Sequence, residues 1–262
     1  MHIWDTFRVA LHPDGLQCDM IFVRLLNSLA ADGGFSASLT YGGIPMQNRT
    51  KRLTESAMLL SLAVVLEVVS KMCIPPMPFG GQVTLVSMLP VVLISYRHGV
   101  RRGLIAGLCY GFIEMALGGS TVTAAFQPGY FGDGAMLGRA LTMVGLDYVL
   151  AFTVLGLGGC VRDLIHKPGP GLMMASIVSL TCRYCVHVLS GYILFSGWAA
   201  WFFTQDGFPA WGAVLVERLS PRMLGFVYSL VYNGMYMVPE IILTAAVALL
   251  IARVPGVTEK VN

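Results

Sequence analysis

The sequence predicts an all-α integral membrane protein, a bundle of six transmembrane helices. Hydrophobic residues make up 56% of the 262 residues and charged residues only 12%, whereas a soluble domain carries about 25% charged residues. The mean hydropathy is +0.72. A stretch of about 20 apolar residues crosses a bilayer core of about 30 Å as a helix. Six such stretches occur, near residues 56–74, 82–97, 101–119, 138–161, 171–197 and 223–252.

The charges that flank these stretches orient the bundle. Only RHGVRR, residues 97–102, separates the second stretch from the third, which indicates a tight helical hairpin with its turn at one membrane surface. Basic residues are enriched on the cytoplasmic side, and a cytoplasmic turn places most of them there, so both termini are expected in the cytoplasm. That side then holds Arg49, Lys51, Arg52, Arg97, Arg101, Arg102, Arg162, Lys167, Arg253 and Lys260, and the outer side holds Lys71, Arg139, Arg218 and Arg222.

The membrane domain is expected at residues 51–256. Residues 1–50 have mixed charge and no long apolar run, so we expect an N-terminal extension that is disordered or that reflects a start assigned too far upstream. Residues 257–262 are expected to form a short cytoplasmic tail. The net charge of +3 is too small to indicate a nucleic-acid partner.

The sequence lacks common motifs of ATP hydrolysis and of proteolysis. GxxxxGKS/T, HExxH and GxSxG do not occur, although these mark phosphate loops, zinc proteases and serine hydrolases. Most of the six cysteines lie in or beside apolar stretches, which is typical of packing, so we expect no disulfide. Cys182 and Cys185 precede His187, but a metal site there would require a distorted helix. We therefore expect no enzyme activity, no cofactor and no bound metal.

Apart from the basic residues assigned above to the two membrane surfaces, six ionisable residues lie inside the apolar stretches. Each costs about 2.5 kcal/mol or more at the bilayer centre, so each needs a compensating partner. Glu67 and Glu114 lie near the outer ends of their helices, and mutual pairing or snorkelling toward the interface explains them. Asp147, Arg183 and His187 call for a more specific explanation. The six are Glu67, Glu114, Asp147, Arg183, His187 and Glu240.

One face of the fifth stretch combines charge, bare backbone and an aromatic ring. At about 100° per residue, Arg183, His187, Gly191 and Phe195 form a single stripe. The stripe could line a cavity for a flat ligand with a polar edge, with Asp147 of the fourth stretch facing it. It could equally be a packing seam, in which Gly191 lets two helices approach and Arg183 neutralises an acidic residue nearby. Spacing alone leaves both interpretations open.

The last stretch and the outer loops carry further polar and aromatic residues. Tyr228 and Asn233 stand about 140° apart on an ideal helix, so both could contact one ligand only at the helix edge or on an unwound turn. Residues 73–83, CIPPMPFGGQV, suit either a short lid over a cavity or a plain connection. Three tryptophans in the last outer loop are typical of an interfacial anchor. They are Trp198, Trp201 and Trp211.

Five segments, taken in order, match one family of membrane proteins. They are LTESAMLLSLA from residue 53, PFGGQVTLVSMLPVVLISYRHGVRRGLIAGL from 78, LDYVLAFTVLGLGG from 146, RYCVHVLSGYILF from 183, and YSLVYNG with MVPE from 228. The chain thereby resembles the thiamine-specific substrate-binding subunit, or S component, of bacterial energy-coupling factor (ECF) transporters. The resemblance covers about residues 53–245. The combination of LDY, HxxxG and YSxxxN is more specific than the hairpin motif, which many S components share.

The resemblance implies a thiamine site. Asp147 takes the place of an acidic residue that faces the aminopyrimidine or the thiazolium ring, with Tyr148 beside it. His187 hydrogen-bonds the ligand, Gly191 leaves room for it, and Phe195 stacks on it. Some relatives have glutamate at the position of Asp147 and tryptophan at that of Phe195. The remaining polar contacts are implied for Tyr228 and Asn233.

The resemblance also implies partners and a location. Ala57 and Ser61 have the small-xxx-small spacing that lets another helix pack closely. That helix would belong to the ECF transmembrane coupling subunit, with two ATPase subunits beneath it; packing within the chain's own bundle is the alternative. The implied protein captures thiamine at the outer face of a bacterial cell membrane, which it crosses several times. Two other functions stay open: an S component for another small heterocycle or a thiamine precursor, and an intramembrane enzyme using Asp147 and His187 as acid and base.

Overall fold

The computed structural model describes residues 48–75, 81–131 and 136–259, which form helices and no β-strand. The predicted all-α class is therefore confirmed. The predicted N-terminal extension lies outside the described residues as far as residue 47. The long helices are α3 (Asn48–Cys73), α5 (Val100–Leu117), α9 (Pro168–Phe195) and α12 (Pro221–Ile251). The shorter elements are α4 (Leu89–His98), α6 (Gly119–Ala125), α7 (Met136–Met143), the π-helical η2 (Val144–Leu150), α8 (Ala151–Thr153), the 3₁₀ helices η3 (Val154–Val161) and η4 (Ser196–Trp198), α10 (Ala199–Phe203) and α11 (Trp211–Arg218).

Four helices of the described chain are long and apolar enough to cross a membrane. A fifth crossing requires α5 and α6 together, which are bent by 78° around Gly118. The predicted second span, near residues 82–97, is helical only in α4, whose 10 residues extend about 15 Å. The six crossings therefore stay a prediction. The four helices are Thr50–Cys73, Met136–Val161, Pro168–Phe203 and Pro221–Ile251.

The chain before α4 is not helical because side chains of distant helices bind its backbone. Glu240 of α12 accepts hydrogen bonds from Thr84 N at 2.6 Å and from Thr84 Oγ1 at 2.7 Å. Ser70 Oγ of α3 accepts a hydrogen bond from Leu85 N at 2.7 Å. Val86 has φ 61°, a left-handed conformation that strains a β-branched residue. Non-helical backbone is tolerated at membrane depth where protein groups satisfy it in this way.

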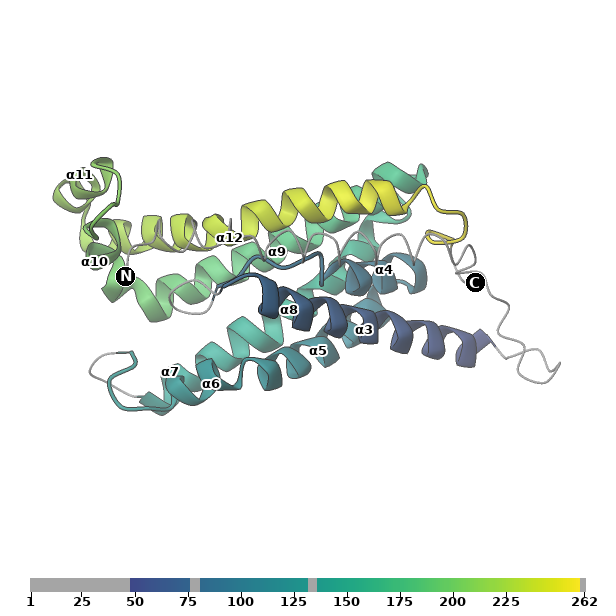
Figure 1. Ribbon diagram of the computed structural model, residues 1–262, viewed down its shortest axis with the longest axis horizontal. Helices are drawn as coiled ribbons and strands as arrows, with labels where there is room; N and C mark the ends of the chain where they lie inside the picture. The colour runs from purple at the N-terminus through teal and green to yellow at the C-terminus, as the bar shows by residue number, and fades with distance from the viewer. Residues whose placement is uncertain (1–47, 76–80, 132–135, 260–262) are drawn as a thin grey trace.

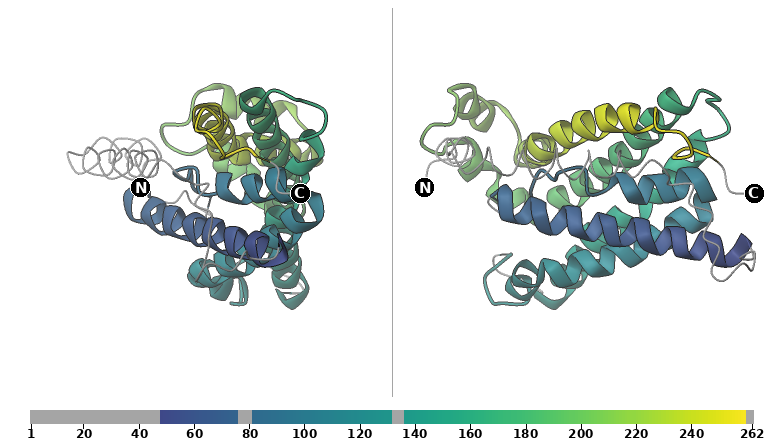
Figure 2. Two further views of the ribbon diagram at one scale, coloured as in Figure 1. Left: turned by 90° about the vertical axis from the view of Figure 1, so that its right-hand side faces the viewer. Right: turned by 45° about the vertical axis from the view of Figure 1, so that its right-hand side comes forward.

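The helices pack around α4, which lies near the centre of the bundle. All ten residues of α4 are buried, and it contacts α3, α5, η3 and α9. Helices α9 and α12 lie side by side along the bundle, and α6, α7, α10 and α11 gather at one end of it (Figures 1 and 2). Close approach between α5 and the η2–η3 helix depends on glycines. A Cβ on Gly107 would meet the carbonyl of Phe152, and a Cβ on Gly156 would meet the backbone of Gly103 and Leu104.

The last described residues are tied to the turn between α4 and α5. Arg97 Nη1 donates hydrogen bonds to the carbonyl oxygens of Gly256 and of Val257, the latter at 2.6 Å. Arg97 Nη2 lies 3.2 Å from Glu55 Oε2 of α3. Val257, the first residue of the predicted tail, is buried. The tail thus starts in contact with the hairpin turn.

One cysteine departs from expectation. Cys73 is disulfide-bonded, so the prediction that the chain has no disulfide is wrong. Cys73 is the last residue of α3 and directly follows Lys71 and Met72, where the apolar run ends. The residue is only half-buried there, so its thiol is not enclosed by helix packing. The free cysteines among the described residues are Cys109, Cys160, Cys182 and Cys185.

Candidate functional site

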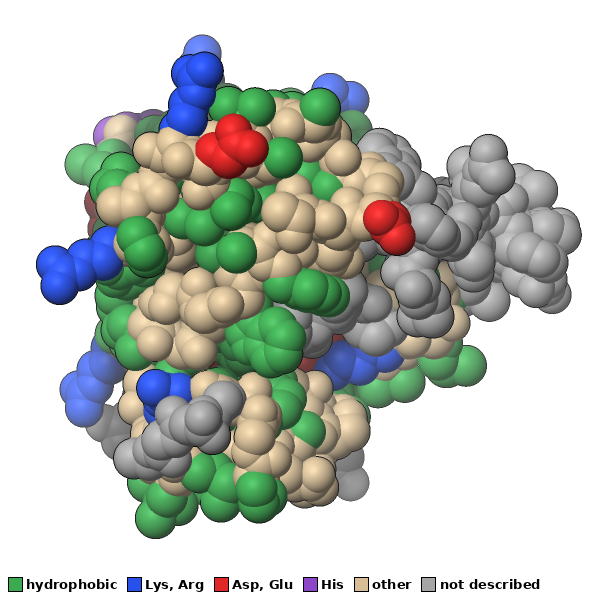
Figure 3. All heavy atoms as spheres, turned by 90° about the vertical axis from the view of Figure 1, so that its left-hand side faces the viewer, with side chains coloured by type: hydrophobic (Ala, Val, Ile, Leu, Met, Phe, Trp, Pro, Cys, Tyr) green, Lys and Arg blue, Asp and Glu red, His purple; other side chains and the backbone are tan. Residues whose placement is uncertain are grey.

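A cavity of about 370 Å³ lies between α3, α5, η2, α9 and α12, a volume in the usual range for small-molecule sites. Its lining includes Lys71 and Leu117, near the C-terminal ends of α3 and α5, and Phe195, the last residue of α9. The cavity therefore lies toward the end of the bundle that carries α10 and α11, the predicted outer end. Figure 3 views this end, where most described side chains are hydrophobic or uncharged. The predicted interfacial tryptophans are exposed: Trp198, Trp201 and Trp211.

Asp147 and His187 meet at the wall of this cavity. Asp147 lies in η2, and π-helical turns are wider than α-helical ones and are frequent at functional sites. Asp147 Oδ1 lies 3.0 Å from His187 Nδ1, and Oδ2 accepts a hydrogen bond from Ser190 Oγ at 2.7 Å. The side chain of Asp147 is 22% exposed and that of His187 10%. The carboxylate thus remains open to the cavity, whereas the imidazole is almost enclosed.

Arg183 continues this chain of contacts. Its Nε donates a hydrogen bond to His187 Nε2 at 3.1 Å, so His187 Nδ1 carries the hydrogen that faces Asp147. The guanidinium carbon lies 4.2 Å from the centroid of Phe152, within cation–π range, and Nη1 contacts Met88 Sδ. In the described part of the chain Arg183 makes no ion pair. An imidazole and an aromatic ring therefore take the place of the acidic partner that the packing-seam interpretation gave to Arg183.

Aromatic rings give the cavity flat faces. The ring of Phe195 lies 5.5 Å from that of Phe131 and 6.3 Å from that of Tyr130, both in the connection between α6 and α7. Burial raises the pKa of the Tyr130 hydroxyl, and the charge of Asp147 raises it further, so Tyr130 stays neutral. Of the five lining rings, the helical stripe indicated Phe195 and the family resemblance implied Tyr148. The five are Tyr148, Phe152, Phe195, Tyr232 and Tyr236.

Three residues implied as ligand contacts lie behind the cavity wall. A Cβ on Gly191 would meet Ser229 Oγ and, at 2.9 Å, Asn233 Nδ2, so Gly191 serves the close contact between α9 and α12, as the packing-seam interpretation required. Asn233 Oδ1 accepts a hydrogen bond from Tyr236 at 2.6 Å. Tyr228 is 1% exposed and packs in an aromatic cluster. Gly191, Tyr228 and Asn233 are absent from the lining that the described residues provide.

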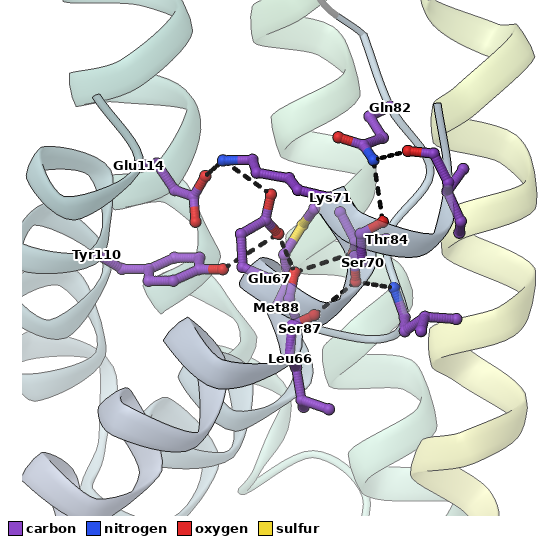
Figure 4. A network of polar contacts seen from close by, with 12 residues as sticks. Leu66, Glu67, Ser70, Lys71, Gln82, Thr84, Ser87, Met88, Tyr110 and Glu114 are labelled. Atoms are coloured by element: carbon purple, nitrogen blue, oxygen red, sulfur yellow. Dashed lines mark hydrogen bonds and ion pairs between the residues drawn. The ribbon is translucent and has the colours of Figure 1, made fainter. Parts of the chain in front are cut away.

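A second part of the wall carries three charged residues that the sequence patterns did not assign to a site. Lys71 Nζ lies 3.3 Å from Glu67 Oε1 and 3.0 Å from Glu114 Oε2 (Figure 4). The negative charges of Glu67 and Glu114 are therefore compensated by Lys71, which lies between them. The usable signal was the Glu67–Lys71 spacing of four residues, which places both side chains on one helix face, beside an intramembrane Glu114.

Ala57 and Ser61 lie on an exposed face of α3. Leu53 is 72% exposed and Val65 48% exposed on the same face. Ser61 Oγ donates a hydrogen bond to the carbonyl of Ala57 at 2.9 Å, which satisfies the hydroxyl within the helix. The alternative considered for these two residues was packing within the chain's own bundle. Among the described residues no helix covers them, since both are exposed.

Comparison with known proteins gives three findings. A family model described as "Thiamine transporter protein" matches residues 53–211. The thiamine transporter ThiT of Bacillus subtilis (strain 168) is 32% identical over 209 residues, which cover 76% of this chain and 89% of that protein. A solved structure of ThiT from Listeria monocytogenes superposes with a TM-score of 0.53 at 17% identity, covering 81% of this chain and 100% of the other. This last likeness concerns the fold alone.

Proposed function

The chain belongs to the thiamine transporter protein family, and from this premise we propose that it captures thiamine at the outer face of the membrane. It is a multi-pass protein of the bacterial cell membrane. The observation that supports thiamine best is the Asp147 carboxylate, open to a cavity with aromatic walls. Thiamine joins a flat, permanently cationic thiazolium ring to a hydrogen-bonding aminopyrimidine, and a carboxylate beside aromatic faces suits both.

The proposed contacts assign different tasks to the predicted residues. Asp147 binds the ligand directly, and Tyr148 and Phe195 supply ring faces. His187 orients Asp147, because both of its ring nitrogens have protein partners. Asn233 positions Tyr236, which lines the cavity and whose hydroxyl donates a hydrogen bond to Asn233 Oδ1. Gly191 and Tyr228 act by fixing how α9 and α12 pack around the cavity.

We propose that the chain itself catalyses no reaction. The matching family and the Bacillus subtilis relative are both named as transporters. Acid–base catalysis by Asp147 and His187 would need an imidazole nitrogen that faces a substrate. In the structure Nδ1 contacts Asp147 and Nε2 accepts a hydrogen bond from Arg183.

The proposed topology has six crossings with both termini in the cytoplasm. The second crossing along the chain combines the non-helical residues 81–88 with α4. Ser70 and Glu240 bind backbone groups of this non-helical part, which allows it to lie at membrane depth. The bent pair α5 and α6 supplies another crossing. This arrangement places Arg97, Arg101 and Arg102 in a cytoplasmic turn, as the distribution of basic residues favours.

We further propose that the chain is the S component of an ECF importer, with a transmembrane coupling subunit and two ATPase subunits as partners. The support is the exposed small-residue face of α3, where a partner helix could approach the backbone at Ala57 and Ser61. ATP hydrolysis by such partners would supply the energy, since this chain contains no phosphate-loop motif.

Replacing Ala57 and Ser61 together by leucine is expected to reduce thiamine uptake by cells about tenfold or more, because bulky side chains keep a partner helix away. Thiamine binding by the purified variant should change less than about twofold, since both positions lie outside the cavity lining. Ala246→Leu, at an exposed alanine of α12, is the control and should retain uptake. Full uptake by the double variant would contradict the proposed interface.

Titration of the purified full-length protein with thiamine, followed by tryptophan fluorescence, tests the proposed function. Thiamine should quench the fluorescence in a saturable manner, and it should displace a labelled thiamine that hydroxymethylpyrimidine and riboflavin displace more weakly. Tighter binding of riboflavin or of the pyrimidine alone would assign the chain to another heterocycle. Absence of any binding would reject the proposal.

A further inference from the structure

The turn between α4 and α5 lies at the end of the bundle opposite to α10 and α11, where α3 begins and α12 ends (Figure 1). On the proposed topology this end meets the cytoplasmic leaflet of the membrane. Four arginines from separate parts of the chain lie close enough to the buried His98, the last residue of α4, for their charges to act on its imidazole. They are Arg52 of α3, Arg97 of α4, Arg102 of α5 and Arg162, which follows η3.

These arginines differ in how well the protein compensates them. Arg97 is held in place, because it pairs with Glu55 at 3.2 Å and binds two backbone carbonyl groups near the C-terminus. The Nε atoms of Arg52 and Arg162 are buried and have no hydrogen-bond partner among the residues that the structure describes. Arg162 Nε lies 3.6 Å from Asp163 Oδ1, but the side chain of Asp163 is 73% exposed, and solvent weakens such a pair. Arg52 and Arg162 therefore have donors available for an anion.

The imidazole of His98 makes no hydrogen bond to the described part of the chain. Its side chain is 0% exposed, and neither ring nitrogen has a hydrogen-bond partner there. Nε2 lies 3.3 Å from Glu55 Oε2, but without the geometry of a hydrogen bond. In either protonation state the ring has an N–H that can donate to an oxygen. More than about nine in ten buried polar groups are hydrogen-bonded, so this ring points to a partner that the chain itself does not supply.

Backbone donors open toward the same turn. The N-terminus of a helix leaves N–H groups unpaired and binds anions, and the first turn of α5 has no acidic residue and no side-chain cap. Gly99, between His98 and α5, has φ 90°, a conformation that favours glycine, so no side chain covers the turn. A Cβ on Gly99 would lie 3.4 Å from Arg162 Nη1. The helix N-terminus, the guanidinium of Arg162 and the unpaired imidazole thus meet at one place.

We propose that this turn binds the phosphate group of an anionic phospholipid, with Arg52, Arg162 and the N-terminus of α5 as donors. Basic pockets between helices on the cytoplasmic side recognise anionic headgroups in this way, and the fork of a guanidinium group matches a phosphate. A phosphate oxygen that enters between the arginines also offers His98 an acceptor. The inference goes beyond the proposed function, because the thiamine cavity takes no part in it.

A lipid fits this site better than a free anion, because exposed apolar side chains stand beside the arginines. Ile105, about one turn further along α5 than Arg102, is 56% exposed, and Leu164, two residues after Arg162, is 76% exposed. Acyl chains can cover both side chains while the phosphate group binds at the turn. An inorganic anion would leave this apolar surface unused.

Native mass spectrometry of the purified full-length protein in detergent tests the proposal, with phosphatidylglycerol and phosphatidylcholine of identical acyl chains as probes. The wild type should bind phosphatidylglycerol at least about tenfold more tightly than phosphatidylcholine. Arg52→Gln combined with Arg162→Gln should lower this preference about fivefold or more, because each basic residue near an anionic headgroup adds to the attraction. The matched control is Arg218→Gln combined with Arg222→Gln, which removes two exposed arginines near the opposite end and should keep the wild-type preference.

A lysine variant decides the question even if the glutamine variant unfolds, which its unfolding temperature without lipid would reveal. Arg52→Lys combined with Arg162→Lys keeps both charges, so the protein should fold, but it loses the paired N–H groups and should lower the preference about threefold. A preference within about twofold of wild type in the folded glutamine variant or in the lysine variant would overturn the inference. Inorganic phosphate that displaces phosphatidylglycerol at equal concentration would overturn it too, since the ligand would then be a free anion. None of these measurements involves thiamine, so their failure would leave the proposed function standing.

Discussion

Asp147→Asn is expected to weaken thiamine binding at least about a hundredfold, the largest effect of any single substitution in the cavity. The change removes the carboxylate charge that faces the cavity beside aromatic rings. Charge-assisted hydrogen bonds contribute about 1.5–3 kcal/mol, and loss of attraction to a permanent cation in a partly enclosed site adds to this. The measurement is a fluorescence or calorimetric titration of the purified variant with thiamine.

Two further variants show whether the charge of Asp147 or its place is responsible. Asp206→Asn removes an exposed carboxylate from the loop between α10 and α11 and should leave the affinity unchanged. Asp147→Glu restores the charge with one more methylene, so it should recover part of the affinity that asparagine loses. An asparagine variant that binds thiamine within about threefold of wild type would show that this carboxylate does not hold the cation.

The sequence predicted four of the spans well because each is an uninterrupted helical segment with a continuous apolar run. The second span was predicted as a helix from residue 82, but the helix begins at Leu89. The residues before it are bound by Glu240, 156 positions away from Thr84, and by Ser70. Hydrophobicity cannot distinguish such a buried non-helical segment from a buried helix, since both are apolar. Only the long-range hydrogen bonds decide between them.

The candidate site was predicted in part for a related reason. Asp147 and His187 stood out because a lone charge inside an apolar stretch needs a partner. The identity of each partner depends on which helices meet, so an acidic partner was one possibility for Arg183, whereas in the structure it contacts His187 and Phe152. For the same reason Glu67 and Glu114 were attributed to mutual pairing or snorkelling, and the contact of both with Lys71 was not predicted.

Helix geometry also limited the site prediction. Tyr228 and Asn233 could not both face a cavity from one straight helix, and α12 is continuous through Pro239. The structure places both in helix packing, and Tyr236, one turn after Tyr232, faces the cavity instead. The sequence thus indicated that α9 and α12 contribute to the site. Which face of α12 lines the cavity could be seen only from its contacts with α9.

Gly156→Ala is expected to destabilise the protein by about 3 kcal/mol or more and to abolish thiamine binding. The added Cβ would overlap backbone atoms of Gly103 and Leu104, and backbone cannot move aside as a flexible side chain can, so this is the severe end of overpacking. The contact also fixes η3 against α5, and through it the position of η2, which carries Asp147. Thermal unfolding in detergent, with and without thiamine, measures both effects.

Gly138→Ala provides the matched control for Gly156→Ala. Gly138 is exposed in α7, and a Cβ there has no atom within 4 Å among the described residues. Alanine is a better helix former than glycine by about 0.5–1 kcal/mol, so this variant should be as stable as wild type or slightly more stable. If Gly156→Ala instead unfolds at the wild-type temperature and binds thiamine normally, α5 and η3 do not approach as closely as the structure shows. The position of Asp147 would then depend on some other contact.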